Sequence, residues 1–429
     1  MKMNKSSSAV GNCISCGSSL SGVIVNIGDQ YPSAIFLRDK TEREYGLYQS
    51  SLDLTRCSDE RCSLVQLIHQ IDLDIVYQNY PYQSGTTATM QAILSDVVNE
   101  AIRNEPLSEA DVVLDIGGND GSLLNLITSN IRARVNIDAA ANIRQIPQSE
   151  SYTYINSRFE KSIFLELDLP EPKLIFCVAV FYQLHNPLQF CLDIHDIMGR
   201  DSVFILQMTY LDSMIRNNIF DNIVHEHTSY YSLYSLDNLL NRAGLKVVGA
   251  KVVESYGGSL RVYINRQDSN KNVEHLKFDL DAIRESEVVN KTNTYESLYA
   301  FDSRFKFWQA VLRNIIEFQF KIDGPIAGLG ASTKGNMILQ ALEIDTSIMP
   351  YILDNNIKKI GSKTTGSNIP IIDEDSLEEL PNNVLNLPYY YKDFFVKMLV
   401  NKLKGNRYTN LITPLSVPEV LRLTGSKHE

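Results

Sequence analysis

VVLDIGGNDGSLL, residues 112–124, joins an apolar run to a glycine-containing loop and then to a second apolar segment. A short apolar run followed by a glycine turn and a helical pattern predicts a strand–loop–helix unit. The loop departs from the dinucleotide-binding form G-x-G-x-x-G, because position 119 is Asn and position 122 is Ser. Asn is the least costly non-glycine residue in a left-handed backbone, so Asn119 can replace the middle glycine.

The acids around this loop favour S-adenosylmethionine (SAM) as the ligand. Asp115 precedes the glycines, and Asp138 ends the next apolar run, ARVNIDAA (133–140). SAM has no pyrophosphate, and it needs close backbone approach, an acceptor for its ammonium group and an acceptor for its ribose hydroxyls. A simple glycine turn is the alternative. The predicted cofactor-binding residues are Asp115, Gly117, Asn119, Gly121 and Asp138.

Further strands and helices alternate on both sides of this unit. A helix is expected at 86–104, with Thr86 or Thr87 as its N-cap. Buried strands are expected at 173–181, 202–208 and 258–264, and a capped helix, a glycine stop and a strand at 235–248. Alternating strands and helices predict an α/β fold with a doubly wound, largely parallel sheet.

A second glycine loop, GLGASTKG (328–335), lies in the C-terminal part of the chain. It has no preceding acid, but it carries Ser332, Thr333 and Lys334 at the start of a predicted helix. Backbone amides, hydroxyls and a lysine favour a phosphate or pyrophosphate. The stretch 354–371 is expected to line the same mouth, unless it is only a solvated basic loop. The spacing of Asp354 after this loop resembles that of Asp138, which suggests two related halves.

Four of the six cysteines lie in the first 62 residues, as CISC (13–16) and CSDERC (57–62). Two cysteine pairs about forty residues apart, in a chain without an export signal, favour a structural zinc site over disulfides. The alternative is four unrelated reduced thiols. The predicted ligands are Cys13, Cys16, Cys57 and Cys62.

Bulk properties set the class of protein. The 429 residues are 44% hydrophobic and 21% charged, with a net charge of −11 and no long basic block. Nucleic acid and membrane are therefore not expected partners, and MKMNKSSSAVGNC has no apolar core typical of a secretory signal. We expect a cytoplasmic protein with a zinc module (1–75), a SAM-binding domain (76–268), a helical connector (269–322) and a Rossmann-like substrate domain (323–429).

Several blocks together resemble one known family, the three-part, zinc-containing, SAM-dependent C-methyltransferases of deoxysugar biosynthesis. Besides the cysteine pairs and the two glycine loops, the blocks are YPYQSGTTATM (80–90), FYQLHNP (181–187), FDNIVHEHTSYYSL (220–233), GGSLRVYI (257–264) and the DNN…GSNIPI stretch. The resemblance implies a small zinc module, a class I methyltransferase domain and a C-terminal Rossmann-like domain. It also implies a nucleotide-linked 4-keto sugar that is methylated on a ring carbon.

The resemblance further implies roles for individual residues. His227 corresponds to the family's base, and Glu226 to the neighbouring acid that orients it or contacts substrate. A tyrosine near the end of the zinc module acts beside the methyl group; Tyr82 is the match and Tyr80 the alternative. Some relatives have a tyrosine immediately before the His-Glu-His run, where this chain has Val224.

Other polar residues are candidates for substrate contact. His185 follows a buried strand on the side where such enzymes hold substrate, and Arg261 is expected to pair with a phosphate or with a carboxylate on a strand edge. If residues 224–232 are extended, His225 and His227 share a face, and a structural role is favoured for His225. Ser332, Thr333 and Lys334 complete the predicted substrate site.

Three other functions are compatible with parts of this pattern. A SAM-dependent O- or N-methyltransferase would use the same cofactor loop, and a non-catalytic zinc and nucleotide binder would need no base. An NAD-linked oxidoreductase is disfavoured by Asn119 and the acid-led first loop. The pattern leaves the oligomeric state open between a monomer and a small homo-oligomer.

Overall fold

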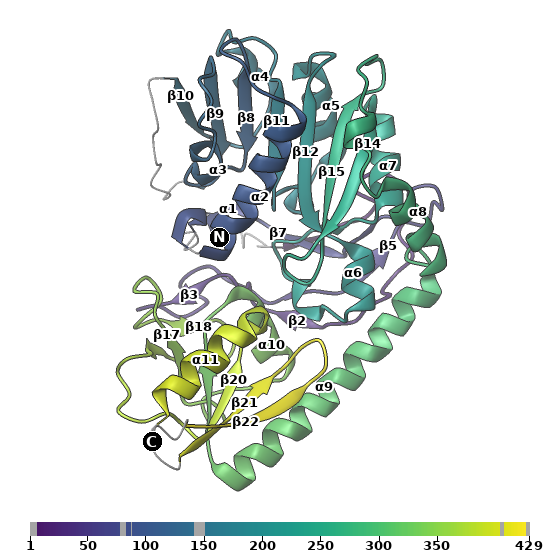
Figure 1. The fold of residues 1–429 in the computed structure, drawn as a ribbon. Helices are drawn as coiled ribbons and strands as arrows, with labels where there is room; N and C mark the ends of the chain where they lie inside the picture. The colour runs from purple at the N-terminus through teal and green to yellow at the C-terminus, as the bar shows by residue number, and fades with distance from the viewer. Residues whose placement is uncertain (1–6, 78–82, 87, 141–150, 404–406, 426–429) are drawn as a thin grey trace.

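The computed structural model describes residues 7–77, 83–86, 88–140, 151–403 and 407–425. Two α/β units lie one above the other, and the N-terminal segment passes between them (Figure 1). A long helix, α9, runs along one side from the upper unit to the lower. The α/β class predicted from the alternating pattern is confirmed.

The upper unit is built on a seven-stranded sheet of order β10-β9-β8-β11-β12-β15-β14. The strands are β8 (Val112–Ile116), β9 (Ala133–Asp138), β10 (Tyr152–Asn156), β11 (Leu174–Val178), β12 (Val203–Thr209), β14 (Leu245–Val253) and β15 (Ser259–Arg266). Five neighbouring strands are parallel, and the pairs β12–β15 and β15–β14 are antiparallel. The strand order reverses between β8 and β11, where ligands bind in doubly wound sheets.

Helices cover both faces of this sheet. They are α2 (Ala88–Asn104), α3 (Ser122–Asn125), α4 (Lys161–Leu165), α5 (Pro187–Ile197) and α7 (Leu233–Arg242), whereas α6 (Leu211–Arg216) packs toward α9. The helix predicted at 86–104 is confirmed, although it begins at Ala88, after a short 3-10 turn at Ser84–Thr86. Its proposed cap Thr87 lies outside the described residues. The capped helix predicted from residue 235 begins earlier, at Leu233, and its cap is Ser232, whose side chain accepts from the Ser235 amide.

The lower unit has a six-stranded sheet of order β19-β17-β16-β20-β21-β22, parallel except for the last pair. Its elements are β16 (Ile326–Leu329), α10 (Thr333–Ala341), β17 (Ile352–Asp354), β19 (Ile371–Asp373), β20 (Asn383–Asn386), α11 (Lys392–Lys402), β21 (Tyr408–Thr413) and β22 (Glu419–Thr424).

The two units use their strand-ending aspartates in the same way. Asp138 accepts from the amides of Asn119 and Ala140, at 2.8 and 2.7 Å. Asp354 accepts from the amides of Ala331 and Asn356, both at 2.7 Å. In both cases the carboxylate bonds the glycine loop and the amide two residues further on. This likeness agrees with the hypothesis of two related halves.

The connector consists of α8 (Leu280–Val289) and the 29-residue α9 (Tyr295–Asp323). The buried side of α9 carries apolar residues at helical spacing, and Phe301, Phe305 and Trp308 surround the ring of Phe220. This packing joins α9 to the short 3-10 turn η3 (Phe220–Asn222) beside the predicted catalytic block.

The N-terminal segment pairs with both units. Strands β5 (Leu54–Arg56) and β6 (Val65–Leu67) form a three-stranded sheet with β13 (Ser229–Tyr230) of the upper unit. Strand β3 (Phe36–Leu37) pairs with β18 (Lys363–Thr364) of the lower unit. The segment therefore ties the block 224–232 to the lower unit, although the exact domain limits stay a prediction.

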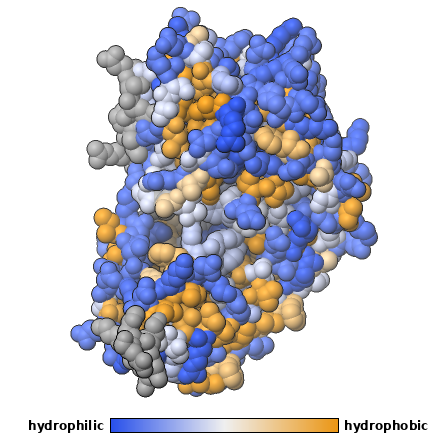
Figure 2. Space-filling model, viewed as in Figure 1, coloured by the Kyte–Doolittle hydropathy of each residue, from blue (hydrophilic) through white to orange (hydrophobic). Residues whose placement is uncertain are grey.

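The visible surface is mainly hydrophilic, and apolar residues gather near the bottom, over the lower unit (Figure 2). Within the described ranges, no helix has both the length and the apolar character needed to cross a bilayer.

Candidate active site

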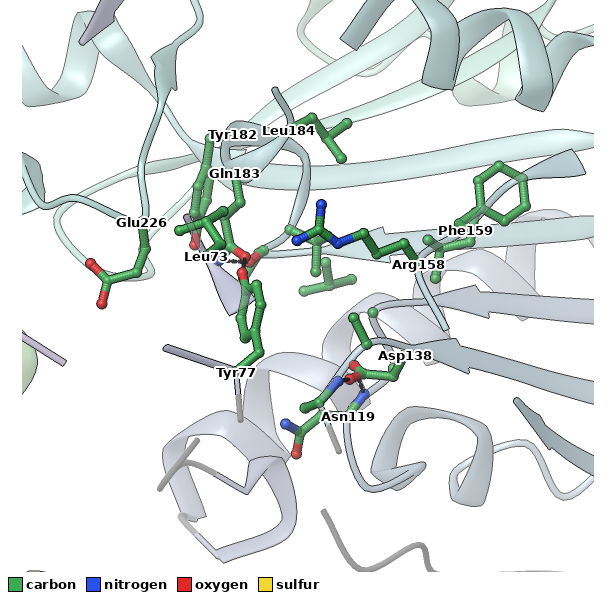
Figure 3. Close-up of a pocket in the computed structure, with 18 of the residues that line it drawn as sticks. Leu73, Tyr77, Asn119, Asp138, Arg158, Phe159, Tyr182, Gln183, Leu184 and Glu226 are labelled. Carbon is green, nitrogen blue, oxygen red and sulfur yellow. Dashed lines mark hydrogen bonds between the residues drawn. The ribbon is translucent and has the colours of Figure 1, made fainter. Parts of the chain in front are cut away.

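A cavity of about 780 Å³ opens at the carboxyl ends of β8, β9 and β11. Its walls come from the first glycine loop, the segment after β9, the FYQLHNP block, residues 224, 226 and 227, and the start of the helix after the second glycine loop. Both α/β units therefore contribute to one cavity. Figure 3 shows Asp138 and Asn119 at one end and Glu226 at the other, with Tyr77, Tyr182 and Gln183 between them.

The first glycine loop has the close approach that the sequence predicts. Gly117 has φ 70°, and a Cβ there would lie 2.3 Å from Val180. Asn119 has φ 50°, so it adopts the left-handed conformation expected for a residue replacing glycine. Gly117 and Asn119 line the cavity, whereas Gly121 precedes α3 with φ 83° and does not.

Acidic side chains give this end of the cavity a strong preference for cations. Asp115 is buried, and its Oδ2 has no hydrogen-bond partner among the described residues. Burial, followed by the nearby charges of Asp138 and Asp120, raises its pKa well above the usual carboxyl value. Burial also raises the pKa of Asp138. A bound cation would offset this repulsion, and SAM carries both an ammonium and a sulfonium.

Residues 224–227 form a turn, in which the His227 amide donates to the Val224 carbonyl at 3.0 Å. The extended conformation considered for this block is therefore wrong. The consequence is that the two histidines do not share a face. His225 is buried with Nε2 3.1 Å from the Ser50 carbonyl and does not line the cavity, which agrees with the structural role predicted for it.

His227 lines the cavity, and its tautomer is fixed by its partner. Nδ1 lies 2.7 Å from the carbonyl oxygen of Asn222. A carbonyl can only accept, so Nδ1 carries the proton and Nε2 of the neutral ring carries a lone pair. Burial, and then the positive charge of Lys334, lowers the pKa of His227 to about 3. The ring is therefore neutral near pH 7, and Tyr182 packs against it with ring centroids 4.1 Å apart.

Glu226 is the other polar group of this turn. It is 6% exposed, and neither carboxylate oxygen has a partner among the described residues. Burial raises its pKa from 4.5 to about 7. A buried carboxyl that lines a cavity without a protein partner is available to a hydroxyl or amine of a ligand.

The free energy of unfolding is expected to respond to Glu226. Between pH 4.5 and about 7 the native state holds a proton on Glu226 that the unfolded state loses, so stability falls as pH rises. The total is on the order of 3 kcal/mol, at about 1.4 kcal/mol per pKa unit. Because Glu226→Gln has no charge, its melting temperature minus that of the native protein should grow from about pH 5 to about pH 8. A constant difference across this range would show that Glu226 does not titrate as described.

Some of the other predicted substrate residues line the cavity in the structure, and others do not. His185, Thr333 and Lys334 line the cavity. Ser332 does not; it caps α10, with its side chain accepting from the Gly335 amide at 2.9 Å. Residues 354–371 do not border this cavity, although Asp354 and Lys359 of that stretch contact the second glycine loop at Ala331. Tyr80 and Tyr82 lie outside the described residues.

Arg261 lies away from the cavity and is completely buried. Its guanidinium donates to Glu100 at 2.8 Å, to Asp96 at 2.6 Å and to Gln207 at 2.7 Å. The pairing with a carboxylate considered from the sequence is the one observed, and these contacts hold α2 against β15. A substrate role for Arg261 is not proposed further.

The four N-terminal cysteines come together in one cluster. The four Sγ atoms all lie within 4.8 Å of one another. The Sγ atoms of Cys13 and Cys62 are 3.7 Å apart, and those of Cys16 and Cys57 are 3.4 Å apart. Thiolates about 2.3 Å from a tetrahedral zinc ion have comparable separations. Gly17, with φ 77°, donates its amide to the Cys13 carbonyl at 2.8 Å and turns the chain around the cluster. The residues present therefore fit a four-thiolate site.

Sequence reasoning missed the residues that support His227. The Asn222 carbonyl accepts a hydrogen bond from the His227 ring, and the Asn222 side chain accepts one from Lys334. The Asp221 carboxylate accepts from the hydroxyls of Tyr389 and Tyr390. The residues FDN at 220–222 were part of a resembling block, but the contacts of Asn222 with Lys334 and of Asp221 with the two tyrosines span more than one hundred residues in sequence. The only available signal was their position next to VHEH.

Comparisons with known proteins agree with this geometry. Residues 87–250 match the family described as "Methyltransferase domain", and residues 254–415 match the family described as "C-methyltransferase C-terminal domain". C-methyltransferase NovU of Streptomyces niveus is 26% identical over 377 residues, which cover 86% of this chain and 87% of that protein.

Among solved structures, the calicheamicin-biosynthesis methyltransferase CalO1 is 11% identical, with a TM-score of 0.32 over 41% of this chain and 55% of that one. The 1,6-didemethyltoxoflavin-N1-methyltransferase of Burkholderia thailandensis is 15% identical, with a TM-score of 0.31 over 42% of this chain and 78% of that one. Likeness at this level does not bear on activity.

The seven-stranded sheet, the acid-led glycine loop and the matched domain define a methyltransferase with a Rossmann-like fold. The match to a C-methyltransferase C-terminal domain and the similarity to C-methyltransferase NovU then indicate that the methyl group is transferred to carbon. The chain combines a methyltransferase domain with a C-methyltransferase C-terminal domain, and it is a SAM-dependent C-methyltransferase.

Proposed function

We propose that this enzyme methylates the carbon next to the ketone of a nucleotide-linked 4-keto deoxysugar, with His227 as the base. The observation that carries the proposal is the 2.7 Å contact between His227 Nδ1 and the Asn222 carbonyl. That contact leaves Nε2 unprotonated on a residue that lines the cavity. A hydrogen next to a ketone is weakly acidic, so a positioned base is needed to remove it.

SAM would occupy the acidic end of the cavity, where it would supply an electrophilic methyl group. Asp138 and the backbone around Asn119 are placed to hold its ribose and to exclude water, and Asp115 offers an unpaired carboxylate oxygen to its positive charge. Gly121 makes the turn into α3.

The substrate would occupy the opposite end, beside residues 224–227. Glu226 would offer its carboxyl to a hydroxyl or amine of the sugar, and His185, which also lines the cavity, is proposed as a second contact. Thr333 and Lys334 bring the lower unit to the substrate end of the cavity. The proposal of a nucleotide-linked sugar rests on the resemblance to the C-methyltransferases of deoxysugar biosynthesis. Tyr82 or Tyr80 beside the methyl group, a cytoplasmic location and a monomer or small homo-oligomer stay predictions.

We also propose that Cys13, Cys16, Cys57 and Cys62 hold a structural zinc ion. Four thiolates leave no open position for a reactant, so the role would be to stabilise the N-terminal segment. That segment supplies β6, which pairs with β13 two residues after His227, and the Ser50 carbonyl that contacts His225. The metal would therefore act on the active site by fixing the block 224–232.

Solvent deuterium exchange tests the carbon chemistry without methyl transfer. The enzyme is incubated in D2O with S-adenosylhomocysteine and a panel of nucleoside diphosphate-linked 4-keto-6-deoxysugars, and deuterium next to the ketone is measured by mass spectrometry. We expect enzyme-dependent exchange that His227→Gln lacks. Methyl transfer to an oxygen or nitrogen of a substrate, with no exchange on any ketone, would favour an O- or N-methyltransferase instead.

A further inference from the structure

Lys334 places a cation in the substrate end of the cavity. It follows the loop of the lower unit, and its Nζ lies 2.5 Å from Asn222 Oδ1 and 3.4 Å from the Tyr390 hydroxyl. The rings of Tyr390 and Tyr256 lie 4.8 and 5.3 Å from the same nitrogen. These contacts fix the ammonium on one side and leave it part of the cavity wall.

Asn222 holds both Lys334 and His227. Its side-chain oxygen accepts from Lys334, and its backbone oxygen accepts from His227 Nδ1. The two groups therefore occupy fixed positions around one residue, although they come from opposite α/β units. A base and a hydrogen-bond donor held in this way can act on neighbouring atoms of one substrate.

The second glycine loop offers less to a phosphate than the sequence suggests. The Ala331 amide donates to Asp354, and the Gly335 amide donates to the Ser332 side chain at 2.9 Å. Two amides that a phosphate cradle would use are thus bonded within the lower unit. The lysine is the charged part of this loop that reaches the cavity.

We propose that Lys334 is a catalytic residue that donates a hydrogen bond to the ketone oxygen of the substrate as it becomes an enolate oxygen. This inference rests on the proposed function, in which His227 takes the proton. In that step the C–H bond breaks and its proton passes to His227 Nε2. The C–H electron pair forms a carbon–carbon double bond, and the carbonyl π pair moves to the oxygen that faces Lys334 Nζ. A fixed cation stabilises this oxyanion more than the neutral ketone.

The surroundings keep Lys334 suitable for this role. Burial lowers its pKa from the usual lysine value, and the nearby charge of Asp221 opposes that change. The titratable groups around it are Asp221, His227, Tyr256, Tyr389 and Tyr390. Because its charge lowers the pKa of His227, removal of the charge should raise that pKa.

The test compares Lys334→Met with Lys359→Met. Lys359 is a buried lysine of the same unit that donates to the Ala331 carbonyl and does not border the cavity. Deuterium exchange is measured, with S-adenosylhomocysteine present, on the panel sugar that exchanges fastest with the native enzyme. We expect Lys334→Met to lower the maximal exchange rate by about 100-fold or more, with a small change in half-saturation. In Lys334→Met the pH at which the exchange rate falls on the acid side should also rise. Lys359→Met should behave as the native enzyme does.

Each other outcome has a defined meaning. A raised half-saturation concentration with an unchanged maximal rate would make Lys334 a phosphate ligand and overturn the proposal, as would native exchange. If the native enzyme exchanges no sugar of the panel, the proposed function fails first. If Lys334→Met does not fold by circular dichroism, Lys334→Gln is used, because it keeps a polar donor without the charge; native-like maximal exchange in that variant would overturn the proposal.

Discussion

His227→Gln is expected to lower methyl transfer by about 10²–10⁴-fold, the range typical of a lost general base. Glutamine can keep a donor to the Asn222 carbonyl, but it has no ring nitrogen that can take a proton. SAM binding, measured by isothermal titration calorimetry, should stay near the native value because the acidic end of the cavity is unchanged.

His225→Gln is the matched control for this variant. His225 belongs to the same turn and is equally buried, but its Nε2 contacts the Ser50 carbonyl outside the cavity. We expect native-like turnover from His225→Gln, with at most a loss of stability. Equal losses of turnover in both variants, with SAM binding intact, would contradict the assignment of the base.

Loss of the cysteine cluster is expected to have the largest effect on stability. Zinc binding by small structural sites contributes about 10–16 kcal/mol, comparable to the whole stability of a typical domain, about 5–15 kcal/mol. Cys57→Ser should therefore lose the metal, unfold the N-terminal segment and inactivate the enzyme through the β6–β13 pairing. Metal content by mass spectrometry and thermal unfolding measure both effects.

Cys191→Ser provides the control for that experiment. Cys191 is fully buried but lies outside the cluster, in the core of the upper unit. Its replacement should cost about 1–3 kcal/mol for an unsatisfied buried hydroxyl, with full metal content. A metal-free native protein that melts at the same temperature before and after chelation would show that the four thiols are not a zinc site.

The local features of the fold could be predicted from sequence because they depend on near neighbours. The acid-led loop at 115–121 predicted a strand and turn that the structure contains, including the left-handed Asn119. The paired cysteines predicted a cluster because their spacing brings them around one point. In the loop a few adjacent residues determine the conformation, whereas the cluster joins residues up to 49 positions apart and was predictable because four thiolates can share one metal ion.

The parts that failed depend on distant contacts. Residues 224–227 look extended in sequence, but packing against the N-terminal sheet and the Tyr182 ring accompanies a turn there. The partners of Arg261, Glu100 and Asp96, come from a helix more than 150 residues earlier. The contact of Lys334 with Asn222 joins the two α/β units, and no sequence pattern near either residue predicts it.

The most direct test of the proposed reaction is transfer of a deuterated methyl group from labelled SAM. The enzyme is incubated with the panel of nucleoside diphosphate-linked 4-keto-6-deoxysugars, and the products are located by mass spectrometry and NMR. We expect one labelled methyl on the ring carbon next to the ketone, formed at least about 100-fold more slowly by His227→Gln. A label found on oxygen or nitrogen, or carbon methylation that persists at the native rate in His227→Gln, would contradict it.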